Sequence, residues 1–191
     1  MKKVISLILS VLMFYFVFTG CAKSEVENDP TQDNTQSSEN SGILSSFSTT
    51  DIDGNTVDQS VFKGKKLTMV NIWATFCGPC INEMPDLGEI SEEYADKGFQ
   101  IIGIPVDVTD YYGNIDAGQV ELAKDIIDET NADYLHIMPS VSLNQAKLNQ
   151  VTSVPETIFI DENGNQVGQS YIGSRSKQQW KDIIDSLMEN M

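Results

Sequence analysis

The chain has 191 residues, of which 40% are hydrophobic and 21% charged, a composition that is ordinary for a globular protein. Its 12 basic residues against 28 acidic ones give a net charge of −16. Charge of this sign repels phosphate backbones and anionic lipid headgroups, which argues against nucleic acid as a partner. The length fits one folded unit better than two.

The first 20 residues have the pattern of a signal peptide. Lys2 and Lys3 precede an apolar run over residues 4–18, and small residues lead to Cys21. The run is short for a membrane-spanning helix, which needs roughly 20 residues. The segment 18–21, Phe-Thr-Gly-Cys, resembles the bacterial lipobox, although Phe18 stands where Leu is preferred. We therefore predict lipidation of Cys21; the alternative is an uncleaved N-terminal anchor that leaves the domain on the same side of the membrane.

The segment that follows, residues 21–42, is predicted to be a flexible acidic tether. Residues 22–42 contain no aromatic residue and a single Val, too little apolar surface to offset the loss of chain entropy on folding. The tether would hold a folded domain, residues 43–191, away from an acidic membrane surface.

From residue 43 onward the pattern is that of an α/β fold. Two short strands flank a turn at residues 51–55, and further strands are predicted at 67–73, 99–106, 134–138, 157–161 and 166–172. Helices are predicted at 80–97, around 120–127 and at 180–191. The order of these elements predicts a mixed sheet that is covered on both faces.

One segment carries the chemistry of the chain, because a buried strand leads directly into Cys77-Gly-Pro-Cys80 at the start of a helix. Unpaired backbone N–H groups and the helix dipole favour negative charge at the position of Cys77. Such a position can lower a thiol pKa from about 8.5 to about 7, and the thiolate is the attacking species. Cys80 lies one turn further on, within reach of the first sulfur.

Other uses of the two cysteines find little support. A zinc site needs further ligands, and only His136 and Cys21 remain. A structural disulfide across two residues would constrain the unfolded chain very little. A peroxide-reducing thiol would need a threonine where Ala74 stands, and copper delivery would need a well-placed histidine. We expect His136 to be structural, and we predict neither a metal nor an organic cofactor.

The segment 73–80, WATFCGPC, resembles the active site of the thioredoxin superfamily, and residues 47–188 follow the order of elements of that fold. The similarity is greatest to membrane-anchored extracytoplasmic thiol-disulfide reductases of the TlpA/ResA type, through the hairpin at 47–65 and the pattern Cys77-x-x-Cys80-x-x-Glu83-x-Pro85. The resemblance implies a thioredoxin-like α/β fold, with a central mixed sheet flanked by helices and an N-terminal β-hairpin extension.

The resemblance also implies roles for residues around the thiols. Glu83 would exchange protons with Cys80, because Asn71 occupies the place of the proton-transferring Asp of thioredoxins; the alternative is an exposed helix acid. Pro155 would follow a cis bond and turn the Val154 main chain toward a substrate, the alternative being a trans turn proline.

Five further aromatic or proline positions lie in or near the expected site. Trp73 and Phe76 would form an apolar platform, Phe76 standing where relatives often carry Trp. Pro85 should kink the helix. Tyr111 and Tyr112 would rim the substrate groove, although surface packing explains them equally well.

The predicted function is that of a monomeric thiol-disulfide oxidoreductase on the outer face of the cytoplasmic membrane. Its partners would be disulfide-containing extracytoplasmic proteins, such as apocytochrome c or a methionine sulfoxide reductase, and its electrons would come from a membrane thiol donor. Gly78 and Pro79 favour reduction, as in thioredoxin. The alternatives are a disulfide oxidase or isomerase, and a non-catalytic binding or sensing lipoprotein that has kept the fold.

Overall fold

The structure is a computed structural model that describes residues 42–110 and 113–191. The predicted signal peptide, Cys21 and nearly all of the predicted tether lie outside these residues, as do Tyr111 and Tyr112. In the part of the chain that is described, no helix combines the length and apolarity needed to cross a membrane.

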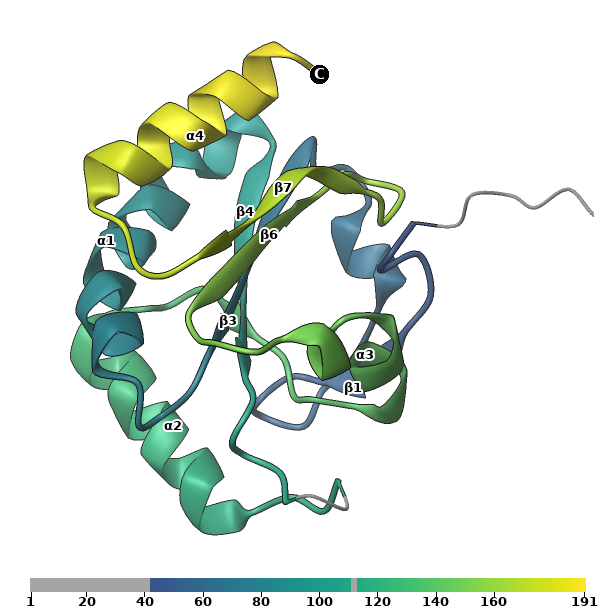
Figure 1. Ribbon diagram of the computed structural model, residues 1–191, viewed down its shortest axis with the longest axis vertical. Coiled ribbons are helices and arrows are strands. Elements are labelled where there is room, and N and C mark those ends of the chain that lie inside the picture. Colours follow the sequence, from purple (N-terminus) through teal and green to yellow (C-terminus); the bar gives the residue numbers. More distant parts are fainter. Residues whose placement is uncertain (1–41, 111–112) are drawn as a thin grey trace, which may run out of the picture. The chain divides into compact units, whose positions relative to one another are not determined.

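A five-stranded mixed sheet forms the centre of the domain, in the order β5-β4-β3-β6-β7 (Figure 1). The central strand β3 (Leu67–Trp73) runs parallel to β4 (Phe99–Pro105) and antiparallel to β6 (Glu156–Ile160). The edge strands are β5 (Leu135–His136) and β7 (Gln166–Ile172). Every residue of β3 is buried, which explains its nearly continuous apolar sequence. The mixed thioredoxin-like sheet predicted from the sequence is confirmed.

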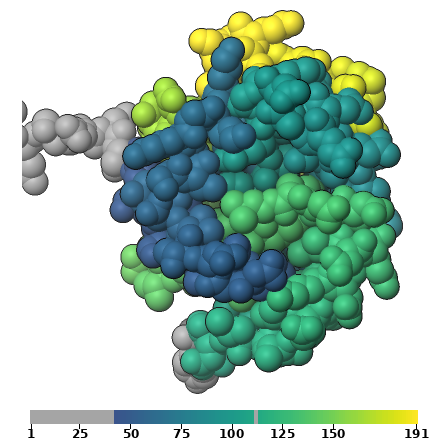
Figure 2. Space-filling model, turned by 180° about the vertical axis from the view of Figure 1, so that it is seen from behind, coloured from purple at the N-terminus to yellow at the C-terminus, as the bar shows by residue number. Residues whose placement is uncertain are grey.

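Helices cover one face of the sheet, and a mixed layer covers the other (Figure 1). The first face carries α1 (Gly78–Tyr94), α2 (Ala117–Thr130) and α4 (Lys177–Glu189). The second face carries the short helix α3 (Val141–Ala146), the hairpin of β1 (Ser48–Thr50) and β2 (Thr56–Asp58), and two of three 3₁₀ turns. These turns span Gln59–Phe62, Ala95–Lys97 and Leu148–Gln150, the second of them ending α1. Figure 2 shows the segment from residue 42 through the β1–β2 hairpin lying beside the α3 region on the surface.

The side chains on the two faces of β3 belong to two separate apolar cores. Met69 and Trp73 pack with side chains of α1, α2 and α4, whereas Val70 and Ile72 pack with the hairpin and α3. The alternation follows from the two-residue repeat of a strand. A strand that is apolar on both faces must lie at the centre of the sheet, and this constraint fixes where its carboxyl end meets α1.

The helix that follows β3 begins earlier than its predicted start at Cys80. Cys77 is its N-cap and Pro79 lies in its first turn, where a missing N–H has no cost. The helix continues through Pro85 to Tyr94, and a 3₁₀ turn then leads to Gly98, whose φ of 78° suits glycine.

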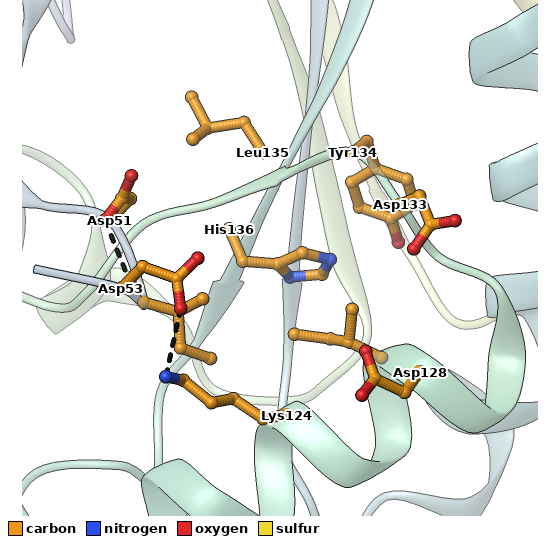
Figure 3. A pocket seen from close by; sticks show the side chains of 10 residues that line it. Asp51, Asp53, Lys124, Asp128, Asp133, Tyr134, Leu135 and His136 are labelled. Carbon is orange, nitrogen blue, oxygen red and sulfur yellow. Dashed lines mark hydrogen bonds and ion pairs between the residues drawn. The ribbon is translucent and has the colours of Figure 1, made fainter. Parts of the chain in front are cut away.

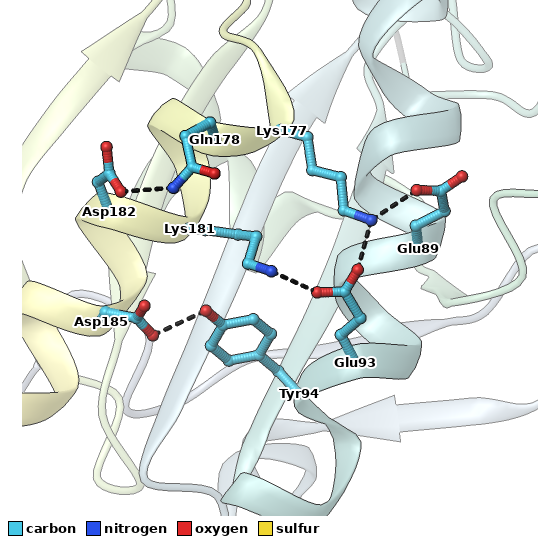
Figure 4. Close-up of polar contacts among 8 residues, drawn as sticks. All are labelled: Glu89, Glu93, Tyr94, Lys177, Gln178, Lys181, Asp182 and Asp185. Atoms are coloured by element: carbon cyan, nitrogen blue, oxygen red, sulfur yellow. Dashed lines mark hydrogen bonds and ion pairs between the residues drawn. The ribbon is translucent and has the colours of Figure 1, made fainter.

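Charged side chains join α1 to α4 at the surface (Figure 4). Lys177 bridges Glu89, at 2.5 Å, and Glu93, while Lys181 contacts Glu93 at 2.6 Å. Hydrogen bonds from the two lysines lower the pKa of Glu93 to about 2. Single exposed pairs contribute little to stability, but a shared carboxylate gives this network a fixed geometry. The network holds the start of α4, including buried Trp180, against the active-site helix.

His136 is a buried packing residue, as expected. Its ring stacks on Tyr134 at 4.6 Å and meets Trp73 edge-on at 5.8 Å between ring centroids. Its Nε2 lies 3.1 Å from the carbonyl oxygen of Ala132, and that oxygen can only accept, so Nε2 carries the proton. Burial lowers the pKa of His136 to about 4. The strand around it is shorter than predicted, covering two residues of the predicted 134–138.

Because Gly103 of β4 has no side chain, the imidazole ring of His136 can occupy the space beside it. A Cβ at Gly103 would lie 2.3 Å from His136 Nδ1, and the ring cannot retreat because Trp73 and Tyr134 hold it. We expect Gly103→Ala to destabilise the fold by about 1–3 kcal/mol, the usual cost of overpacking a core. Denaturant unfolding measures the change.

The matched control is Gly118→Ala in α2, where the new methyl group would meet only Asp116 Oδ1 at 3.4 Å. There the substitution should be neutral or stabilising, because it restricts the unfolded chain. Equal losses of stability in the two variants would contradict the clash at Gly103.

Candidate active site

The turn between β3 and α1 is held by one carboxylate. Asp107, which follows β4, accepts hydrogen bonds from the Thr75 backbone N–H at 3.0 and 3.1 Å and from the Thr75 hydroxyl at 2.6 Å. Within the turn, the Cys77 N–H donates to the Ala74 carbonyl at 3.0 Å. Because the carboxyl ends of the parallel strands β3 and β4 lie side by side, a residue after each strand can fix the same turn. The turn delivers Cys77 to the first position of the helix.

Cys77 and Cys80 are joined in a disulfide, with the first sulfur at the end of the helix and the second inside it. The Sγ of Cys77 accepts a hydrogen bond from the Cys80 N–H at 3.2 Å. Cys80 is fully buried, whereas Cys77 keeps 6% of its surface. In the reduced protein the same N–H group and the helix N-terminus favour a thiolate at Cys77. This arrangement suits an outer attacking sulfur and an inner resolving sulfur.

Glu83 lies one turn beyond Cys80 and is 3% exposed, so it is not the exposed helix acid of the alternative interpretation. Its carboxylate accepts hydrogen bonds from Asn71 Nδ2 at 3.1 Å, the Arg175 backbone N–H at 3.1 Å and Trp180 Nε1 at 3.2 Å. Burial raises the pKa of Glu83 above its ordinary value, and the three hydrogen bonds oppose that rise. A buried carboxyl with a raised pKa holds its proton more tightly than an ordinary glutamate and is suited to proton exchange.

The Asn71 amide is placed to serve both protonation states of Glu83. Its Nδ2 donates to Glu83 and to Thr157 Oγ1, at 3.1 and 3.2 Å, while its Oδ1 is buried without a hydrogen-bond partner. A half-turn of the amide exchanges the two atoms and presents an acceptor to a protonated Glu83. Asn71 cannot take the proton itself, but it can stabilise either form of its neighbour.

The bond between Val154 and Pro155 is cis, as predicted. Pro155 is anchored by its carbonyl, which accepts from the Gly173 N–H at 2.9 Å. Within the described residues, Thr152, Ser153 and Val154 make no backbone hydrogen bond to other backbone groups. Val154 is half-buried against the core that contains both cysteines. The main chain ahead of Pro155 therefore keeps its own donors and acceptors free.

The predicted platform of Trp73 and Phe76 is wrong for Trp73. Its side chain is fully buried, because Trp73 is still part of the strand that is covered on both faces. Phe76 belongs to the turn that follows the strand, and its side chain is 77% exposed. Of the two predicted platform residues, Phe76 is the one that presents an aromatic surface next to Cys77 in the sequence.

Three residues of the site are missing from the sequence-based prediction: Asp107, Arg175 and Trp180. The last two contact Glu83 across 92 and 97 positions of the chain, and no local pattern marks them. Asp107 has a usable signal, because it follows a strand predicted to lie next to the strand before the thiols.

A pocket of about 460 Å³ lies elsewhere, between the β1–β2 turn, the end of α2 and β5 (Figure 3). Asp51, Asp53, Asp128 and Asp133 line it, and Lys124 binds Asp53 at 3.0 Å. Neither cysteine nor Glu83 contributes to it. Across residues 42–110 and 113–191, no three His, Cys, Asp or Glu side chains come together as a metal site.

Comparisons with known proteins agree with this geometry. The family model described as Redoxin matches residues 27–184, and so begins within the predicted tether. The thiol-disulfide oxidoreductase ResA of Bacillus thuringiensis subsp. konkukian is 27% identical over 141 residues, covering 74% of each chain. ResA of Oceanobacillus iheyensis is 34% identical over 116 residues, covering 60% of this chain and 53% of that protein.

Solved structures show the same fold. A thiol:disulfide interchange protein from Chlorobium tepidum TLS has a TM-score of 0.62 and 28% identity, covering 75% of this chain and 93% of that one. A DsbF homologue from Corynebacterium diphtheriae has a TM-score of 0.60 and 26% identity, covering 75% and 85%. The chain belongs to the Redoxin family, and within the thioredoxin superfamily it is a thiol-disulfide oxidoreductase of the TlpA/ResA type.

Proposed function

We propose that the protein reduces disulfide bonds of partner proteins outside the cytoplasm, with Cys77 as the attacking sulfur. The observation that carries this proposal is the hydrogen bond from the Cys80 N–H to Cys77 Sγ at the start of α1, since it favours negative charge on the outer sulfur. The buried Glu83 and the free main chain ahead of Pro155 support it.

The reaction proceeds by two exchanges of sulfur partners. The Cys77 thiolate attacks one sulfur of the partner's disulfide, that S–S bond breaks, and the leaving sulfur takes up a proton. Cys80 then loses its proton and attacks Cys77, which releases the second partner sulfur as a thiol. Two electrons and two protons pass to the partner, and the enzyme is left with the Cys77–Cys80 disulfide.

Glu83 would assist the second step. As a carboxylate it can take the Cys80 proton, and its raised pKa makes it a stronger base than an ordinary glutamate. The partner would bind as an extended segment along the main chain of Val154, because unpaired backbone groups there can form strand-like hydrogen bonds. Phe76 and Pro155 would contact its side chains.

The proposed setting is the outer face of the cytoplasmic membrane. Cys21 would carry the lipid, residues 21–42 would form the tether, and the domain would act as a monomer. Electrons would come from a membrane thiol donor, since cytosolic reductants lie on the other side. The relatives named ResA and the thiol:disulfide interchange protein support the reaction class, and the partner would be an apocytochrome c or another extracytoplasmic thiol protein.

Trapping tests the proposal directly. Cys80→Ala removes the resolving sulfur, so the mixed disulfide between Cys77 and a partner should accumulate and be recovered from cells of the native host by non-reducing electrophoresis and mass spectrometry. Cys77→Ser in the same background is the matched control and should recover none. Failure of Cys80→Ala to form any adduct that depends on Cys77 would favour a binding or sensing role.

The direction of exchange follows from the reduction potential. Thioredoxin, which has the same Gly-Pro between its cysteines, lies at about −270 mV, and isomerases lie at about −180 mV. We expect equilibration with glutathione or dithiothreitol to place this dithiol nearer the thioredoxin value. A potential more positive than about −180 mV would make the protein an oxidase or isomerase instead.

Glu83→Gln should slow release of the partner from the mixed disulfide by about a hundredfold at neutral pH, since general base assistance is typically of that order. The wild-type rate should rise with pH through an inflection above 4.5, and the variant should lack that inflection. Stopped-flow measurement of release against pH tests both. Glu92→Gln, an exposed acid of the same helix, is the control and should retain the wild-type profile.

Glu83→Gln should also change how the free energy of unfolding depends on pH. Because burial raises the pKa of Glu83, ionisation costs folding free energy as pH rises from 4.5 through the raised pKa. The wild type should lose stability relative to Glu83→Gln across that window and show no further change above it. A constant difference at all pH values would contradict a buried, titrating Glu83.

A further inference from the structure

We propose that Lys147 and Glu156 form a positioning pair. The pair holds the main chain of residues 152–154 in the position that hydrogen bonding to an extended substrate segment requires. The inference rests on the proposed function, in which that main chain binds the partner. It adds two residues to the site that lie outside the thiol chemistry and on the other face of the sheet.

The pair is buried at the base of the segment that leads to Pro155. Lys147 Nζ lies 2.5 Å from Glu156 Oε1, and the two residues are 7% and 4% exposed. Lys147 closes the end of α3, and Glu156 is the first residue of β6, directly after Pro155. Nine positions separate them in the sequence, so the contact closes a short loop.

One end of that loop is fixed by the sheet. Glu156 pairs with Ile72 of β3 and with Ile172 of β7, so its backbone lies between two strands. Successive residues of β6 alternate between faces: Thr157 points toward Asn71, and Glu156 points toward the face that carries α3. Lys147 therefore reaches from α3 to a point that cannot move independently of the central strand.

The middle of the loop has no such support. Gln150 N–H donates to the Lys147 carbonyl at 2.9 Å and Val151 N–H to the Leu148 carbonyl at 3.1 Å, and the backbone bonds stop there. Between Val151 and Pro155 the described chain makes none. The position of these free groups depends on how the two ends of the loop are held, and the ion pair joins those ends.

A contribution to folding stability does not explain why this buried ion pair is present. Burying two charges removes them from water, and replacing such a pair with apolar side chains of similar volume is often neutral or stabilising. A charged hydrogen bond is directional, however, whereas apolar contact is not. What the pair adds is a fixed register between the end of α3 and the start of β6, and the free main chain lies between them.

The test uses the full-length chain with Lys147→Met and Glu156→Gln combined. The two changes keep the side-chain lengths close to native and leave no lone buried charge. With insulin as a disulfide substrate, we expect KM to rise about tenfold, equivalent to about 1.4 kcal/mol of lost binding, and kcat to stay within about twofold. Amide hydrogen exchange at Gln150 and Val151 should become faster.

Two further variants separate positioning from general damage. Lys147→Arg keeps the charged hydrogen bond and should hold KM within about twofold of wild type. Asp53→Asn combined with Lys124→Met removes another ion pair, at the far β1–β2 turn, and should leave KM equally unchanged. If the double variant at the loop does not fold, Lys147→Met combined with Glu156→Met, which leaves neither a charge nor an unpaired polar group in place of the pair, should give the same rise of KM.

An unchanged KM and unchanged exchange in the folded loop variant would overturn the proposal. A fall in kcat with KM unchanged, or an equal rise of KM in the Asp53 and Lys124 control, would also overturn it. If the wild-type protein leaves insulin oxidised, the proposed reduction of protein disulfides fails, and the exchange comparison alone then decides the role of the pair.

Discussion

The geometry of the active site depends on the carboxylate of Asp107. The chain must leave a strand that is buried on both faces and enter a helix within four residues, Ala74 to Cys77. Three hydrogen bonds from Thr75 to Asp107 hold that turn, and the Val106 N–H adds a bond to the Trp73 carbonyl at 2.9 Å. With the turn fixed, Cys77 must become the N-cap, and its sulfur must meet the N–H of Cys80.

Glu83 shows how a charge is accommodated next to this dithiol. Three donors from three parts of the fold, Asn71, Arg175 and Trp180, offset part of the cost of burying its carboxylate. Two of them belong to α4 and the loop before it, so the position of α4 bears directly on the site. The ion network between Lys177 and Glu93 holds that helix in place from outside (Figure 4). By holding α4, the surface ion network therefore helps to position two of the donors that bind the buried Glu83.

Much of the fold can be predicted from the sequence, because long apolar runs and turn residues determine it locally. The strands at 67–73 and 166–172 have the predicted bounds, and the hairpin and closing helix are present. Among the short elements, α3 is missing from the prediction because its six residues are too few to show a period, whereas β5 covers only two residues of the strand predicted at 134–138. The burial of Trp73 also escapes it, since a residue at a strand end can point into the core or out to solvent. The partners of Glu83 escape it because they are distant in sequence.

The two faces of the sheet carry different parts of the proposed reaction. The dithiol and its proposed proton partner lie on the face of α1 and α4, where buried donors can tune a carboxyl group. The proposed substrate strand is positioned from the opposite face, by Lys147 at the end of α3, which reaches the residue after Pro155. β6 passes between the two arrangements, with Thr157 contacting Asn71 and Glu156 contacting Lys147. Adjacent residues of one strand therefore link the proton site to the binding main chain, and a shift of β6 would alter both.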